Sequence, residues 1–267
     1  MNRTVYALRR EIVEVGRRVY NRGYVAANDG NISARLDRGR VLITPSGVSK
    51  GFMKPEDLIV VDLAGKVLEG RKKPSSELLM HLRIYQERPD VNGVVHAHPP
   101  YATGFAVAGI PLTQCVLPEV IVSLGGIPLA EYGTPGTEEL FKPVLKYIKD
   151  YDAFLLANHG ALSIGPSVMA AYFKMETLEH FAQIATVAIQ LGGLKTLGEA
   201  EVRELIALRQ NFGIKTQVSC ESCDRSDTEA CVAAGPAATA ASGASALDRQ
   251  ELVEAVTAAV VRQLSGA

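Results

Sequence analysis

Two histidines separated by one residue, His96 and His98, carry the clearest chemical signal in the sequence. They lie at the end of an apolar run, residues 91–96, that is typical of a buried strand. Side chains two apart in an extended segment point to the same face, so both imidazoles can converge on one metal ion. The spacing alone leaves a structural role open. The position of the two histidines at a strand end favours a metal site, because binding sites in open α/β sheets lie at the ends of strands.

A third imidazole, His159, follows another apolar run, residues 153–157. Taken alone, this histidine is equally typical of a turn or a helix cap. Three neutral imidazoles with one open or carboxylate position are a common zinc arrangement, so the three histidines together predict a zinc site. Glu77 is the candidate fourth group, although a glutamate in a first helical turn more often interacts with the helix dipole.

Two short segments offer the donors that an anion needs. Ser46 and Gly47 lie in a tight turn after a strand, whereas Ser75 and Ser76 lie where a helix begins and leaves backbone N–H groups free. Asn31 can add an amide donor. Serine and glycine are also common in ordinary turns, so a single segment does not indicate an anion site. The segments together do.

Helices and strands must position these groups. Apolar periodicity predicts helices over residues 4–20, 101–108 and 169–191, and another opened by residues 74–77, whose packing stripe is Leu78, Leu79, Leu82 and Tyr85. Short runs bounded by Gly, Pro and Asp predict strands over residues 31–36, 41–44, 58–62, 91–96 and 153–157. The mixture predicts an α/β fold with a mixed sheet.

The overall composition excludes two classes of partner. The 267 residues carry a net charge of −1 with both signs interspersed, so the chain lacks the positive field that binds nucleic acid. No run of about 18 apolar residues is present to span a bilayer, and the first residues lack the apolar core of an export signal. We therefore expect a cytosolic protein.

Five segments together resemble the class II aldolase and adducin family, which includes the L-fuculose-1-phosphate aldolases. They are residues 30–31, 44–47, 74–77, 96–98 and 158–160. The resemblance covers residues 4–214. It implies a three-layer α/β/α domain around a mixed, largely antiparallel sheet, assembled as a homotetramer with active sites at subunit interfaces.

The resemblance also implies a role for each residue. His96, His98 and His159 would hold Zn²⁺, with Glu77 as an exchangeable ligand and as the base. The substrate phosphate would lie against Asn31, Ser46, Gly47, Ser75 and Ser76. His81, four residues after Glu77 on the same helical face, fits a supporting role better than a ligand role, because the metal already has enough donors.

The implied reaction is cleavage of L-fuculose 1-phosphate, or of a similar ketose 1-phosphate such as rhamnulose 1-phosphate, to dihydroxyacetone phosphate and lactaldehyde. The sequence departs from the family at one position. The fuculose-phosphate aldolases carry a tyrosine there, which protonates the aldehyde oxygen from a neighbouring subunit, and this chain does not. Glu119 and Tyr132 are the two candidate replacements. The departure keeps open a pentulose-phosphate 4-epimerase or a sugar-phosphate dehydratase. An adducin-like binding module is disfavoured by the retained histidines.

Composition changes sharply near residue 214. The sequence predicts a catalytic domain over residues 1–214, a flexible linker over 215–246 that is poor in large apolar groups, and an amphipathic helix over 247–267. Asp248 and Glu251 form a capping-box pattern before that helix. Its apolar stripe is short for a coiled coil and its polar face is poorly suited to a membrane.

The arrangement of linker and terminal helix resembles the encapsulation peptides that load enzymes into bacterial microcompartments. It predicts that this helix binds shell or cargo proteins, because an apolar stripe beyond a complete domain must be buried against something else. The resemblance places the enzyme inside such a compartment.

Overall fold

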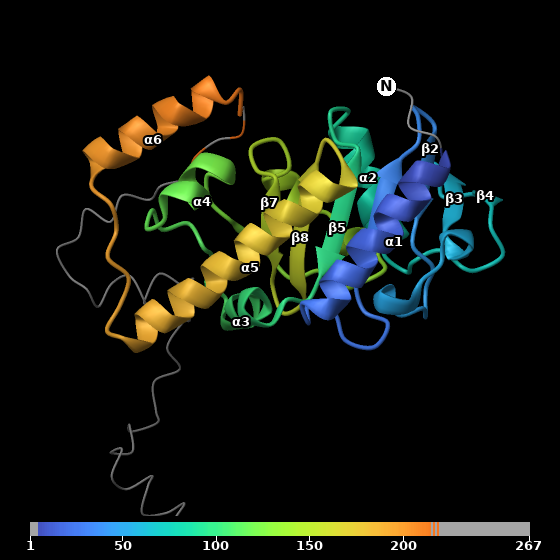
Figure 1. Cartoon of the computed structure of the whole chain (residues 1–267), viewed down its shortest axis with the longest axis horizontal. Helices are drawn as coiled ribbons and strands as arrows, with labels where there is room; N and C mark the ends of the chain where they lie inside the picture. The colour runs from blue at the N-terminus through green and yellow to red at the C-terminus, as the bar shows by residue number, and fades with distance from the viewer. Residues whose placement is uncertain (1–4, 215, 217, 219–267) are drawn as a thin grey trace, which may run out of the picture. The chain divides into compact units, whose positions relative to one another are not determined.

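The computed structural model describes residues 5–214, 216 and 218. The predicted terminal helix lies outside these residues, as does the predicted linker apart from residues 216 and 218. The described residues form a sheet of eight strands in the order β4-β3-β2-β1-β5-β8-β7-β6 (Figure 1). The strands are β1 (Asn31–Arg35), β2 (Arg40–Ile43), β3 (Ile59–Asp62), β4 (Val67–Glu69), β5 (Gly93–Ala97), β6 (Leu129–Ala130), β7 (Ala153–Leu156) and β8 (Gly160–Gly165).

All neighbouring strands in this sheet run antiparallel except β6 and β7, which are parallel. The predicted mixed, largely antiparallel sheet is therefore confirmed. Strand β8 lies between β5 and β7 and is antiparallel to both. The C-terminal ends of β5 and β7 consequently meet at one edge of the sheet.

The four helices predicted from apolar patterns within the described residues are present, with small shifts at their ends. The α-helices are α1 (Val5–Asn21), α2 (Leu78–Glu87), α3 (Pro100–Ala108), α4 (Pro118–Ser123), α5 (Val168–Gln190) and α6 (Glu199–Asn211). The short 3-10 helices are η1 (Lys50–Phe52), η2 (Pro55–Asp57), η3 (Glu138–Leu140) and η4 (Val144–Lys146). Helices α4 and α6 and strands β4, β6 and β8 were not predicted. None of the described helices is long and apolar enough to cross a membrane.

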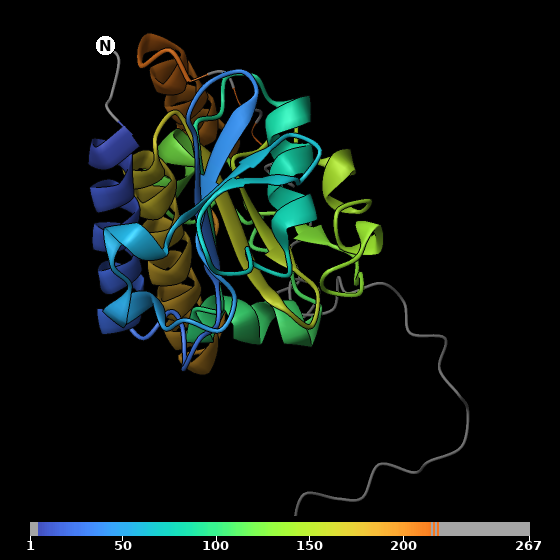
Figure 2. The same cartoon turned by 90° about the vertical axis from the view of Figure 1, so that its right-hand side faces the viewer.

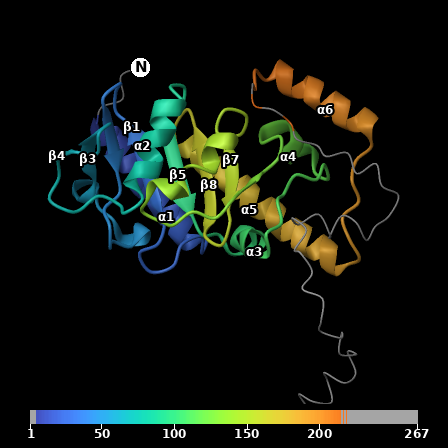
Figure 3. The same ribbon diagram turned by 180° about the vertical axis from the view of Figure 1, so that it is seen from behind.

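Helices cover both faces of the sheet. Helices α1 and α5 pack on one face and α2 on the other, as Figures 2 and 3 show from the side and from behind. Side chains alternate between the faces as the two-residue period of a strand requires. In β2, Leu42 joins the α1 and α5 side, whereas Val41 and Ile43 join the α2 side.

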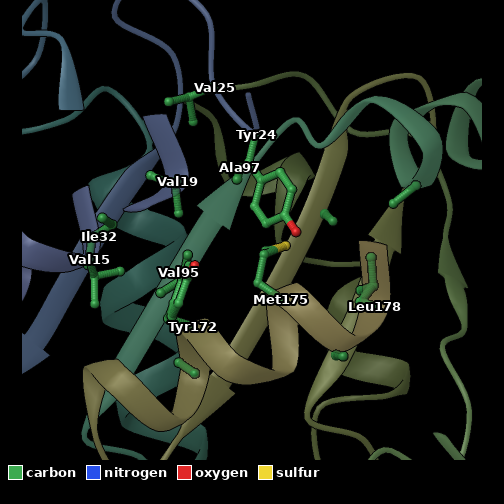
Figure 4. Close-up of a cluster of buried hydrophobic side chains, with 14 of the residues drawn as sticks. Val15, Val19, Tyr24, Val25, Ile32, Val95, Ala97, Tyr172, Met175 and Leu178 are labelled. Atoms are coloured by element: carbon green, nitrogen blue, oxygen red, sulfur yellow. The ribbon is translucent and has the colours of Figure 1, made fainter. Parts of the chain in front are cut away.

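Figure 4 shows the core between the sheet and helices α1 and α5. Val15 and Val19 project from α1 and Met175 from α5, and they meet Ile32 of β1 and Val95 of β5. All five side chains are buried. Complete burial of one such side chain contributes roughly 1.5–3 kcal/mol, so this core holds β1 and β5 rigidly beside each other.

The packing stripe predicted for α2 is partly wrong. Leu78, Leu82 and Tyr85 are buried as expected, but Leu79 is 41% exposed. Met80 and Ile84 are buried instead. Helix α2 packs against the sheet on one side and against the segment that contains η3 and η4 on another. The buried face of this helix is thus wider than a single stripe.

Candidate active site

One edge of the sheet collects the segments that the sequence singled out. His98 follows β5, His159 lies in the turn between β7 and β8, and Asn31 begins β1 directly opposite His96. Glu77 immediately precedes α2. A cavity of about 160 Å³ opens here and is lined by residues from these segments, among them Asn31, Ser46, Gly47, Ser75, Ser76, Glu77, His96 and His98.

The three imidazoles converge. One ring nitrogen from each of His96, His98 and His159 lies within 4.8 Å of the others. The Nε2 atoms of His96 and His98 are 3.1 Å apart. His96 Nδ1 lies 2.9 Å from the Ala161 carbonyl oxygen, which only accepts, so Nδ1 carries the proton and Nε2 turns a lone pair toward the cluster.

Glu77 lies against two of these imidazoles and is 7% exposed. Its Oε2 is 3.2 Å from His96 Nε2, and its Oε1 is 3.1 Å from His159 Nε2. Asn31 Nδ2 donates to Oε2 at 2.8 Å. Burial opposes ionisation of this carboxyl, but the hydrogen bonds from His159 and the Asn31 amide favour the ionised form and hold the pKa of Glu77 below its usual range.

This donor set fits a divalent cation. Three imidazole nitrogens and a carboxylate are ligands that zinc accepts. Within the part of the chain that the structure describes, His159 Nδ1 is buried without a hydrogen-bond partner. Burial lowers the pKa of His96 to about 3, which keeps that ring neutral. A cation would satisfy lone pairs that the protein alone leaves buried.

A buried chain of hydrogen bonds orients Asn31 and, through it, Glu77. Because the Glu77 carboxylate only accepts, the Asn31 amide nitrogen must face it, and Asn31 Oδ1 then faces His81 Nε2 at 2.5 Å. His81 therefore donates through Nε2, and its Nδ1 accepts from Ser33 Oγ at 2.6 Å. Tyr85 OH lies 2.8 Å from Ser33 Oγ and donates to it. Burial lowers the pKa of His81 to about 4, consistent with this neutral ring.

The predicted anion-binding segments lie side by side. The Ser46 N–H donates to the Lys73 carbonyl at 2.9 Å, and the Ser75 N–H donates to the Thr44 carbonyl at 3.1 Å. These bonds join the two segments and use two of their donors. Among the described residues, the N–H groups of Gly47 and Ser76 have no protein acceptor and remain for an anion. Gly47 has a φ of +70°, a conformation that favours glycine.

Lys50 is a residue of this cavity that the sequence did not reveal. Its residue exposure is 1%, and its Nζ donates to the carbonyls of Asn28 and Val48, each at 2.8 Å. Burial lowers the pKa of Lys50 to about 8. A single lysine at the start of a short 3-10 helix gives no periodic or motif signal, so sequence reasoning had no means of distinguishing it from a solvated side chain.

The two predicted proton donors lie elsewhere in this chain. Glu119 is exposed in the first turn of α4, and Tyr132 is 59% exposed. Neither lines the cavity that contains Glu77. Within one chain, the structure therefore does not bring Glu119 or Tyr132 together with the three histidines.

Comparison with known proteins identifies the family. Residues 10–186 match the model of the class II aldolase and adducin N-terminal domain. A 5-deoxy-D-ribulose 1-phosphate aldolase of Bacillus thuringiensis is 36% identical over 208 residues, which cover 77% of this chain and 96% of that protein. A 3-oxo-tetronate 4-phosphate decarboxylase of Pectobacterium atrosepticum is 34% identical over 203 residues, which cover 74% of this chain and 88% of that protein.

A solved structure of an L-fuculose 1-phosphate aldolase superposes with a TM-score of 0.71 at 33% identity, covering 77% of this chain and 96% of that one. The family match extends over more than half of the sequence and includes every residue of the cavity described above. The chain belongs to the class II aldolase and adducin family.

Proposed function

We propose that this chain is a zinc-dependent aldolase that cleaves a ketose 1-phosphate. The preferred substrate is L-fuculose 1-phosphate, or a similar compound such as rhamnulose 1-phosphate, and the products are dihydroxyacetone phosphate and lactaldehyde. One observation carries the proposal: Glu77 contacts two converging imidazoles in a cavity that also holds the predicted anion-binding segments. The family match supports lyase chemistry at this site.

His96, His98 and His159 would hold the metal, with Glu77 as a ligand that substrate displaces. Zinc suits this set of nitrogen and oxygen donors better than calcium or magnesium, which prefer oxygen ligands. When bound, the ion supplies Lewis-acid stabilisation for negative charge on the substrate's carbonyl oxygen.

The phosphate would lie against Gly47, Ser46, Ser75 and Ser76, with Asn31 at its inner end. The unpaired N–H groups of Gly47 and Ser76 point to this role, because a phosphate oxygen accepts several hydrogen bonds. Asn31 has one amide hydrogen committed to Glu77 and a second available to substrate. It can therefore hold the base and the substrate together.

Glu77 would move the proton at C3. In the cleavage direction the C4 hydroxyl loses its proton, the C3–C4 bond breaks to form the aldehyde, and C3 then receives a proton through Glu77. In the condensation direction Glu77 removes that proton from bound dihydroxyacetone phosphate. Its low pKa keeps the carboxylate ionised, and its contacts with the imidazoles and with Asn31 fix its direction.

Glu119 or Tyr132 would exchange the proton of the C4 oxygen. Both side chains are exposed in the single chain, and we propose that one of them reaches the cavity of a neighbouring subunit in a homotetramer. Glu119→Gln and Tyr132→Phe, assayed side by side, assign the group: loss of activity in only one of them identifies the donor.

Product analysis tests the reaction against its alternatives. Purified protein is incubated with L-fuculose 1-phosphate and with rhamnulose 1-phosphate, and triose phosphate is measured by a coupled assay. Release of dihydroxyacetone phosphate supports an aldolase. An epimerase would return an isomer of the ketose phosphate supplied, and a dehydratase would release water from the sugar. One relative is a decarboxylase, so release of carbon dioxide from a 3-oxo acid phosphate is the remaining outcome to measure.

We also propose that the enzyme is cargo of a bacterial microcompartment in the cytosol, bound through the predicted helix at residues 247–267. The proposal rests on the sequence pattern of that segment. Its partner would be a shell or cargo protein that offers an apolar groove.

A further inference from the structure

Lys50 joins the two loops that border the proposed phosphate subsite. Its Nζ donates to Asn28 O on the loop before β1 and to Val48 O just after the Ser46 and Gly47 turn. The side chain is thus held between two segments that both line the cavity. An ammonium group has three donors, and two of them have acceptors in the described part of the chain.

The charges around the cavity make Lys50 distinctive. Among the cavity-lining residues of the described chain, Lys50 is the only lysine or arginine, whereas Asp29 and Glu77 are acidic. A phosphate monoester brings about two further negative charges at neutral pH. Without Lys50, the protein groups of this cavity would oppose that ligand electrostatically.

The hydrogen bonds of Lys50 do not by themselves explain a charged group at this position. Two backbone carbonyls can be satisfied equally well by the two hydrogens of a neutral amide. Burying an ammonium is unfavourable unless a counter-charge is close. Asp29 is a nearby acid that acts on Lys50, but it also lies 3.7 Å from His98 Nδ1. An anionic ligand would supply the missing compensation.

We infer that Lys50 is the cation of the phosphate subsite, where it fixes the Asn28 and Val48 segments and offers its third N–H to a phosphoryl oxygen. The inference rests on the proposed function, because it deepens the phosphate site described there. It explains selection of a phosphorylated substrate over a free sugar, since hydroxyl groups alone would not compensate a buried ammonium.

Inorganic phosphate binding to the metal-loaded protein, followed by ³¹P NMR titration, tests this inference. Lys50→Gln retains donors for both carbonyls and loses the charge, and Lys50→Met removes both. Lys66→Met is the matched control, because Lys66 is exposed in the turn before β4. We expect Lys50→Gln to bind phosphate about tenfold to a hundredfold more weakly, the value of one charge-assisted hydrogen bond, and Lys66→Met to bind as wild type.

Thermal melting and metal content separate a charge role from a structural one. We expect Lys50→Gln to keep both near the wild-type values while phosphate affinity falls. Wild-type phosphate affinity in Lys50→Gln would overturn the inference and leave the aldolase proposal intact. If Lys50→Gln does not fold, phosphate affinity is measured on Lys50→Met, and wild-type affinity in that variant would likewise overturn the inference. Failure of the wild-type protein to bind phosphate would overturn both the phosphate subsite and the role of Lys50.

Discussion

Glu77 combines contacts that serve different purposes. Its two oxygens touch His96 and His159, which is where a metal would lie, and Oε2 also accepts from Asn31. A carboxylate held in this way is ionised and fixed in direction, as a base or an exchangeable ligand must be. Loss of its charge should therefore affect the chemical step far more than the fold.

Glu77→Gln is expected to reduce kcat by about 10²- to 10⁴-fold, because an amide cannot take up the C3 proton. Circular dichroism should show an unchanged fold, since glutamine still accepts from Asn31. Glu87→Gln is the control, because Glu87 is exposed at the end of the same helix. Near-normal turnover in Glu77→Gln would refute the role of this residue as the base.

His81 supports the site through Asn31. We expect His81→Leu to lower the free energy of unfolding by about 1–3 kcal/mol, because Asn31 Oδ1 is left buried without a donor. Turnover should fall as well, since the amide that faces Glu77 becomes free to rotate. Urea unfolding and steady-state kinetics measure both effects. Tyr85→Phe removes only the last hydrogen bond of this buried network, so it should lower the free energy of unfolding by about 1 kcal/mol with little loss of turnover. Equal effects of the two variants on turnover would contradict the orienting role of His81.

At the scale of elements, strand β8 explains why three distant histidines meet. It separates β5 from β7 and is antiparallel to both, so the turn that carries His159 returns to the edge where β5 ends. Gly160 begins β8 directly against the imidazoles. A Cβ there would lie 2.6 Å from both the Ala97 carbonyl oxygen and His98 Cδ2. Only glycine lets the β7–β8 turn approach so closely.

Gly160→Ala should accordingly destabilise the protein by about 1–3 kcal/mol and reduce its bound zinc, because the added methyl group displaces backbone and a ligand ring. Gly104→Ala provides the matched control. Gly104 lies in α3, where an added methyl group would meet no neighbouring side chain or strand within 4 Å, and alanine there should stabilise the helix by about 0.5–1 kcal/mol. Thermal melts and metal analysis of the two variants check the contrast; a Gly160→Ala protein as stable and zinc-rich as wild type would contradict this packing.

The sequence predicted the elements that carry the site because their patterns are local. The prediction that His96 and His98 converge needs only the two-residue period of one strand, which places both side chains on the same face. Strand β8 was missed because only Ala161, Leu162 and Ile164 are apolar between Gly160 and Gly165, and so short a run does not distinguish a strand from a turn. Leu79 and Lys50 show the same limit: the exposure of Leu79 and the burial of Lys50 both depend on segments distant in the chain, which no local window contains.

At the scale of the whole molecule, the predicted terminal helix is separate from the catalytic residues in sequence. Deletion of residues 247–267 is expected to leave turnover unchanged, because the cavity is formed by residues 28–98 and the His159 turn. Co-sedimentation with microcompartment shells should be lost. Truncated protein that still sediments with shells would remove the cargo hypothesis.

The metal site unites all three scales, since it requires the ligand residues, the strand order and a correctly folded domain. Its direct test is zinc content of the purified protein, measured by inductively coupled plasma mass spectrometry. We predict about one zinc per chain in the wild type, much less in His159→Ala, and no change in His180→Ala, whose histidine is exposed on α5. A folded wild-type protein without a stoichiometric divalent metal would contradict the account.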